Sequence, residues 1–171
     1  MALTLVVETG AGLDNANSYV SLADANAYHE AHVQQSDWEA LSSTDRERAV
    51  VMATRVIDDH FTFKGRKTDR LNALKWPRYN MTDEDGWVID SGSIPTRLKN
   101  ATAEMARLLT VEDRTLEADT KGFSRLKIDV VELDVDRGDR RAVIPPMVAR
   151  MLAVWTESIH GSTYTAKLVR G

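Results

Sequence analysis

The strongest constraint on the fold is a helix start that occurs twice, an isoleucine followed by proline and then by apolar residues at helical spacing. The first start is Ile94-Pro95, and its apolar stripe comprises Leu98, Ala101, Met105, Leu108 and Leu109. The second is Ile144-Pro145-Pro146, and its stripe comprises Val148, Met151, Leu152, Trp155 and Ile159, with Gly161 as the expected stop. Proline suits a first helical turn because the amide hydrogen that it lacks has no partner there. The sequence therefore predicts an amphipathic helix after each proline.

Capping boxes predict two more helices in the first half of the chain. Ser21 with Asp24 begins a short helix that places Ala25, Tyr28 and His32 on one face. Thr44 with Glu47 is the second box. It precedes apolar residues at three-to-four spacing: Ala49, Val50, Ala53, Val56, Ile57 and Phe61. This spacing makes the second helix the clearest of the first half.

Alternating apolar residues predict strands. Leu3, Leu5 and Val7 indicate a short strand at the start of the chain. Later, even positions are apolar up to Val130 and odd positions from Val131, a change of phase that predicts a β-bulge or bend near Val130. Arg137-Gly138-Asp139 is then the expected turn of a hairpin that returns towards Ile144.

These elements predict a mainly α fold, a small bundle of four principal helices with a β-hairpin arm and an extended C-terminal tail. With 171 residues and 43% apolar content, the chain fits one domain, expected over residues 1–160 with the arm at about 123–144 and the tail at 161–171. Cysteine is absent, which excludes disulfides, thiolate metal sites and a cysteine nucleophile. No run approaches the ~20 apolar residues of a membrane span, and the first ten residues do not resemble a signal peptide. We therefore expect a soluble, unsecreted protein.

Two stretches have the residue types of metal sites but not the spacing. His29 and His32 are three apart, whereas a zinc helix places its histidines four apart, so we expect exposed or capping histidines. Around Asp83-Glu84-Asp85-Gly86, a calcium loop with Gly86 at its sixth position would have Met81 first and Gly92 last, without the charged anchors. We expect a solvated turn in which Gly86 is left-handed.

The sequence gives little support for catalysis. Gly10-Ala11-Gly12 lacks the third glycine and the lysine of phosphate loops, so it indicates an ordinary turn. The chain has no G-x-S-x-G nucleophile motif. We predict a protein that is not an enzyme, with no catalytic, cofactor or metal residues.

A basic segment at residues 64–78 is the main candidate binding site. It carries a net charge of +5, although the whole chain has a net charge of −4. Phe61, Phe63, Trp76 and Tyr79 flank or interleave the charges, which is the composition of a groove that stacks bases. The candidate nucleic-acid contacts are Lys64, Arg66, Lys67, Arg70, Lys75, Trp76 and Arg78. Alternatively, Trp76 anchors a loop in the core, and the cations face water or pair with the acidic residues 83–85.

Several spaced motifs resemble a family of small tailed-phage and prophage proteins that are often labelled DnaT-like single-stranded-DNA-binding proteins. The motifs occur in order: S-Y-V-S-L-A-D-A, L-x-W-P-R, D-x-D-G and I-P-x-x-L-K-x-A-x-x-E-x-A. They cover roughly residues 8–111, and the layout is also similar to that of phage head–tail connector (adaptor) proteins.

The resemblance implies two alternative functions. As an adaptor, the chain would form a ring of twelve subunits between the portal protein and the next tail or tail-terminator component. It would continue the channel for passing double-stranded DNA, in the virion after assembly in the host cytoplasm. As a DnaT-like protein, it would bind single strands during replication. The acidic net charge favours the adaptor, because a single-strand binder is expected to present a basic groove.

In the adaptor interpretation, the hairpin arm and the tail contact partners. An unpaired strand can add to a neighbour's sheet, and a tail can become ordered on binding. The predicted interface residues are Leu126, Ile128, Val130, Leu133, Arg137, Tyr164, Lys167, Leu168, Val169 and Arg170.

Overall fold

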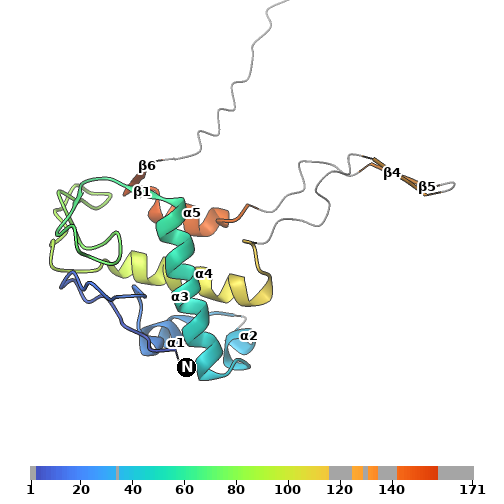
Figure 1. Cartoon of the computed structure of the whole chain (residues 1–171), viewed down its shortest axis with the longest axis horizontal. Helices are drawn as coiled ribbons and strands as arrows, with labels where there is room; N and C mark the ends of the chain where they lie inside the picture. Colours follow the sequence, from blue (N-terminus) through green and yellow to red (C-terminus); the bar gives the residue numbers. More distant parts are fainter. Residues whose placement is uncertain (1–2, 34, 116–124, 129–130, 135–141, 158–171) are drawn as a thin grey trace, which may run out of the picture.

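Helix α4 is the central element of the fold. The computed structural model describes residues 3–33, 35–115, 125–128, 131–134 and 142–157. These residues contain five helices: α1 (Leu22–Glu30), α2 (Gln35–Glu39), α3 (Ser43–His60), α4 (Thr96–Val111) and α5 (Pro146–Leu152). Helix α4 crosses α3 near the middle of the molecule and also contacts α1, α2 and α5 (Figure 1). Every residue of α4 from Leu98 to Arg107 is accordingly buried, apart from the partly buried Lys99 and Asn100.

The prediction of a bundle of four principal helices is wrong, although an antiparallel strand pair does lie within residues 123–144, the predicted hairpin arm. Besides the five helices, the described residues form three two-stranded antiparallel sheets. They pair β1 (Thr62–Phe63) with β6 (Thr156–Glu157), β2 (Arg66–Lys67) with β3 (Arg78–Tyr79), and β4 (Arg125–Ile128) with β5 (Val131–Asp134). Two of these sheets use residues 61–95, the long connection between α3 and α4, where turns and two-residue strands leave no periodicity to recognise.

The helix starts confirm one capping box and correct the other. Ser21 Oγ accepts a hydrogen bond from the Asp24 amide, as predicted. Helix α3 is capped by Ser42, not Thr44, because Ser42 Oγ accepts from the Asp45 amide at 3.2 Å. Both serine and threonine have an acidic residue three positions later, and the earlier cap gives the longer helix. Pro95 precedes the first residue of α4, and its carbonyl accepts from the Leu98 amide, as its position predicts.

The last helix is shorter than predicted. Helix α5 ends at Leu152, and Thr156–Glu157 form strand β6 instead of another helical turn. Trp155 is buried as the apolar pattern indicates, but loops surround it: its indole nitrogen donates to the Thr82 carbonyl, and its own carbonyl accepts from the Lys64 amide. Ile159, Gly161 and the expected tail at 161–171 lie outside the described residues.

The change of phase near Val130 separates two paired strands and is not a bulge within one strand. Strands β4 and β5 pair with Ile128 opposite Val131 and Arg125 opposite Asp134. Even positions of one strand therefore face odd positions of the other, which accounts for the change of phase. Val130 and the expected turn at 137–139 lie outside the described residues. Near the N-terminus, the expected strand is reduced to a single bridge between Val7 and Ser18.

One continuous core joins the helices to the long connection. The Trp76 ring, which is fully buried, lies 5.9 Å from Phe63 and 5.5 Å from Trp155, measured between ring centroids. Figure 1 shows the loops of residues 61–95 gathered on one side of the helices. The core thus fixes the base of the segment that carries the basic residues. None of the helices that the structure describes is both long and apolar enough to cross a membrane.

Candidate nucleic-acid interface

A buried tyrosine ties the basic segment to α3. The Tyr19 hydroxyl donates to the Asp58 carboxylate at 2.5 Å and accepts from the Trp76 amide at 3.2 Å. The second Asp58 oxygen accepts from the Lys75 amide at 3.0 Å. Burial raises the pKa of Tyr19 well above its ordinary value, and the neighbouring Asp58 raises it further. Tyr19 therefore stays a neutral donor, and the start of the W-P-R motif is held in place.

Replacing Tyr19 with phenylalanine should lower the free energy of unfolding by about 1–3 kcal/mol at pH 7, because the Trp76 amide is left unpaired. The difference from the wild type should narrow above pH 10, since the raised pKa makes the folded wild type keep a proton that its unfolded chain loses. This narrowing amounts to about 1.4 kcal/mol per pH unit. Urea unfolding of both proteins at pH 8 and pH 11 measures it, and a difference that is equal at both pH values would contradict the raised pKa.

The glycine turn near the N-terminus encloses a carboxylate of the chain itself. Glu8 is fully buried and accepts hydrogen bonds from the amides of Gly10, Gly12 and Leu13 at 2.8–2.9 Å. The Leu13 carbonyl then accepts from the Ala73 amide, which connects this turn to the basic segment. The amides that could hold a phosphate are therefore occupied by Glu8. The sequence interpretation as an ordinary turn missed Glu8, whose only signal is an acidic residue just before the glycines.

Arg78 is a buried structural clamp. Its guanidinium donates to the carbonyls of Phe63, Lys64, Gly65 and Lys75 at 2.6–3.0 Å, and only 8% of the residue is exposed. Burial lowers the pKa of Arg78. These four bonds hold the turn after β1 against the W-P-R motif and use four of the five N–H groups of the guanidinium, so Arg78 has at most one donor left for a phosphate in this conformation.

Three lysines of the segment also bind backbone carbonyls. Lys64 Nζ donates to Val154 at 2.9 Å, Lys67 Nζ to Asn72 at 2.6 Å, and Lys75 Nζ to Phe61 at 2.8 Å. Lys64 remains exposed, whereas Lys67 and Lys75 are partly buried. The alternative expectation that these cations pair with the acidic turn is not met, because within the described residues the ion pair of that turn joins Glu84 to Arg97.

The exposed part of the segment is smaller than the sequence suggested. Lys64, Arg66, Arg70 and Tyr79 reach solvent, and we call them the ribbon face. Arg66 and Tyr79 are cross-strand partners in the β2–β3 ribbon, and the guanidinium carbon lies 5.6 Å from the centre of the tyrosine ring. Tyr79 is 40% exposed. Trp76 is fully buried and could stack on a base only by leaving the core.

An acidic hairpin, residues 82–88, follows the ribbon directly. Thr82 bridges Val88, and the Asp83 amide donates to the Trp87 carbonyl. The Asp83 carboxylate accepts from the amides of Asp85 and Trp87. Gly86 has φ 86° and open space around it, which confirms the left-handed turn. Trp87 is 74% exposed and Val88 81%, which the sequence analysis did not anticipate.

The structure describes only part of the partner interface that the sequence predicts. Leu126, Ile128 and Leu133 lie in the paired strands β4 and β5. The others lie outside the described residues: Val130, Arg137, Tyr164, Lys167, Leu168, Val169 and Arg170. The interface therefore stays a prediction.

His29 is a core residue, which corrects the expectation of an exposed or capping histidine. It is 1% exposed, and its Nε2 lies 3.1 Å from the Ala103 carbonyl of α4. Burial lowers the pKa of His29, which favours the neutral ring. No cluster of three or more potential metal ligands occurs among the residues that the structure places.

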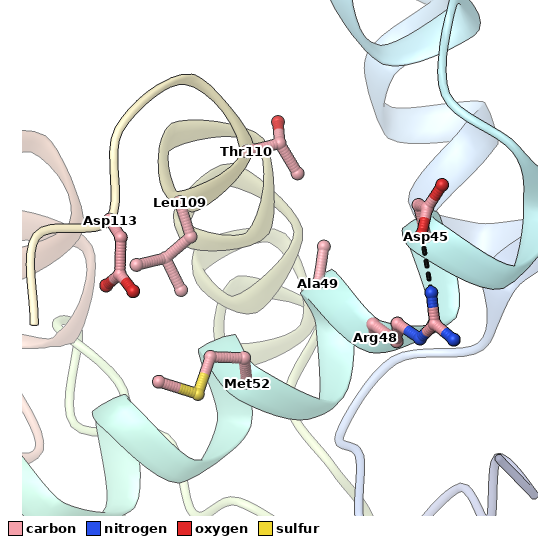
Figure 2. Close-up of a pocket in the computed structure, with 7 residues that line it drawn as sticks. All are labelled: Asp45, Arg48, Ala49, Met52, Leu109, Thr110 and Asp113. Atoms are coloured by element: carbon pink, nitrogen blue, oxygen red, sulfur yellow. Dashed lines mark hydrogen bonds and ion pairs between the residues drawn. The ribbon is translucent and has the colours of Figure 1, made fainter.

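A groove between α3 and α4 is the other candidate site (Figure 2). Its volume is about 220 Å³, and its lining residues are Asp45, Arg48, Ala49, Met52, Leu109, Thr110 and Asp113. The charged groups are already engaged: Arg48 pairs with Asp45 at 2.8 Å, and Asp113 accepts from the Thr115 amide and hydroxyl. Two carboxylates against one guanidinium make this groove unsuited to a phosphate backbone.

Comparison with known proteins gives one match. A family model described as "Putative DnaT-like ssDNA binding protein" matches residues 3–171. No curated protein and no solved structure matches the chain.

Proposed function

The chain belongs to the DnaT-like ssDNA-binding family, and we propose from this membership that it binds single-stranded nucleic acid through the ribbon face. The observation that carries the proposal is the solvent-facing pair of Arg66 and Tyr79. An aromatic ring gives a base a stacking surface, and an adjacent guanidinium can bind phosphate. Lys64 and Arg70 add positive charge from the turn before β2 and the loop after it.

The pair is arranged before any ligand binds. Pairing of β2 with β3 places Arg66 opposite Tyr79, and the buried Arg78 clamp fixes the base of the same ribbon. A preformed site loses less conformational entropy on binding than a mobile one. Three exposed cations nevertheless make a small phosphate-binding surface. The logarithm of the affinity should fall with the logarithm of salt concentration with a slope of about −2, at roughly −0.7 for each phosphate contact to a single strand.

We expect Tyr79→Ala to weaken binding of a fluorescently labelled oligothymidylate about 5- to 150-fold, the range for loss of one base stack. Arg66→Ala should weaken binding and should also make the slope of log affinity against log salt less negative by about 0.7. Fluorescence anisotropy at low and moderate salt measures both effects. Arg55→Ala, which removes an exposed arginine from α3, is the matched control and should bind as the wild type does. Equal losses in all three variants, or no binding even at low salt, would refute the ribbon face as the site.

A second candidate function is the head–tail adaptor of a tailed phage. It is favoured by the hydrogen bonds of Lys67, Lys75 and Arg78 to backbone carbonyls, which leave few cations for phosphates in a chain of net charge −4. In this role the chain would form a ring between the portal protein and the next tail component, around passing double-stranded DNA. Purified virions test the idea, because an adaptor should be present in particles as a ring beneath the portal. Its absence from particles would exclude this role.

A further inference from the structure

We infer that two copies of this chain associate, with the acidic hairpin of each copy docked on the ribbon face of the other. The contact would be reciprocal, as in a two-fold dimer, because both surfaces are carried by each chain. This self-association goes beyond the proposed function and does not require nucleic acid.

The hairpin has the features of a preformed interaction element. Its backbone is fixed by the hydrogen bonds around Asp83, and the Thr82 carbonyl accepts from the buried Trp155. Trp87 is 74% exposed at this fixed position, whereas each of the other three tryptophans is at most 4% exposed. Exposed apolar residues in a polar surround often mark contact sites, and tryptophan is enriched among the residues that dominate binding energy.

The two surfaces have opposite charge. The hairpin carries Asp83, Glu84 and Asp85, and the ribbon face carries Lys64, Arg66 and Arg70. In the part of the chain that the structure describes, no ion pair joins the two sets, and the hairpin carboxylate of Glu84 pairs with Arg97 at the start of α4. Charge complementarity therefore favours a partner that presents the opposite surface, and a second copy does so.

Both surfaces also carry exposed apolar residues, and they lie near each other in the chain. Leu71, 67% exposed, and Tyr79, 40% exposed, lie in or beside the basic ribbon and could cover Trp87 and Val88 of the other copy. Strand β3 ends at Tyr79 and the hairpin begins at Thr82, so both surfaces belong to the loops on one side of the helices (Figure 1). Neighbouring complementary surfaces allow both contacts to form at once around a two-fold axis.

If the proposed function is also correct, the dimer would regulate it. Arg66 and Tyr79 would be covered by the second copy, so a single strand would have to displace the acidic hairpin. This consequence rests on nucleic-acid binding at the ribbon face, whereas the dimer itself does not.

Analytical ultracentrifugation of the full chain tests the dimer. We expect a concentration-dependent dimer at low salt that dissociates as salt is added, because exposed ion pairs are screened. Trp87→Ser should raise the dissociation constant about 30-fold or more, as for a dominant contact residue. Val33→Ser, at a position that is 99% exposed between α1 and α2, is the matched control and should leave the dimer unchanged. Thermal unfolding of each variant checks that it is folded.

Exchanging charges gives the sharpest comparison. Asp85→Lys and Arg66→Glu, both at exposed positions, should each weaken the dimer, and the two changes combined in one chain should restore it because the contacts are reciprocal.

The fluorescence emission of Trp87, the exposed tryptophan, should shift to shorter wavelength as the protein concentration rises. A wild-type protein that stays monomeric, or a dimer unaffected by salt and Trp87→Ser, would overturn the inference. A Trp87 shift seen only with added oligothymidylate would assign this residue to nucleic acid and would also overturn it. Failure of oligonucleotide binding in the monomeric Trp87→Ser variant, whose ribbon face is uncovered, would refute the proposed function alone.

Discussion

Replacing Arg78 with lysine is expected to lower the free energy of unfolding by about 3 kcal/mol, because each buried group left without a partner costs about 1–3 kcal/mol. The guanidinium reaches four carbonyls, three from residues just before β2 and one from Lys75, just before β3. A lysine keeps the charge, but its three donors lie on one nitrogen and cannot span those carbonyls. For a chain of this length the melting temperature should fall by about 6–12 °C. Urea and thermal unfolding measure both quantities.

Arg66→Lys is the control for Arg78→Lys. The same change at this exposed position should alter stability by less than about 0.5 kcal/mol. The pair also separates structure from binding. If Arg78 were a phosphate ligand, Arg78→Lys would leave the fold nearly intact and weaken oligonucleotide binding, which is the opposite of the result expected here.

The helices were predictable because their signal is local. Apolar residues at three-to-four spacing and a preceding proline placed the start of α4 to within a residue, and the Ser21 box placed the start of α1. The error at the end of α5 has a physical reason. Trp155 lies at a helical position relative to Leu152, but its side chain is buried by the loop around Thr82, and periodicity alone cannot distinguish these two kinds of burial.

The candidate site was predictable only in part. The sequence identified the basic segment, and Lys64, Arg66 and Arg70 do reach solvent. It could not show that Arg78 is a clamp, because a guanidinium binds carbonyls and phosphates with the same donors. Only the fold brings the carbonyls of residues 63–65 to that side chain.

Two residues with a distinct place in the structure, Trp87 and Glu8, were not predicted from the sequence. The exposure of Trp87 was not predicted from the sequence. The available signal is Gly86, because a left-handed glycine is typical of a hairpin turn and Trp87 follows it directly. Glu8 was overlooked because a buried carboxylate is rare, and its three amide partners come from the glycine turn that follows it. For Glu8 the missing information is its three amide partners, and for Trp87 it is the exposure of the hairpin that carries it.

Replacing Gly10 with alanine is expected to destabilise the fold by about 4 kcal/mol or more, in the range reserved for severe local conflicts. Gly10 has φ 108°, which a residue with a side chain rarely adopts, and an added Cβ would lie 1.9 Å from the Gly92 carbonyl oxygen. The obstructing atoms are backbone and cannot rotate away as a side chain would. Any shift of Gly10 also disturbs its hydrogen bond to the buried Glu8.

Two other glycines distinguish the backbone clash at Gly10 from the strain of its positive φ. Gly86 has a positive φ and open space around it. Gly86→Ala should therefore lower the free energy of unfolding only by the strain of a left-handed alanine, about 1–2 kcal/mol. Gly92 is the residue that Gly10 contacts, and its φ is outside the left-handed range. A Cβ added at Gly92 would lie 3.7 and 3.8 Å from the Asp90 carboxylate oxygens, so Gly92→Ala should change stability by less than about 0.5 kcal/mol. Denaturant unfolding of the three variants ranks them. If Gly10→Ala costs no more than Gly86→Ala, the N-terminal turn does not dock on residues 92–93, and the frame that positions the basic segment must be assembled differently.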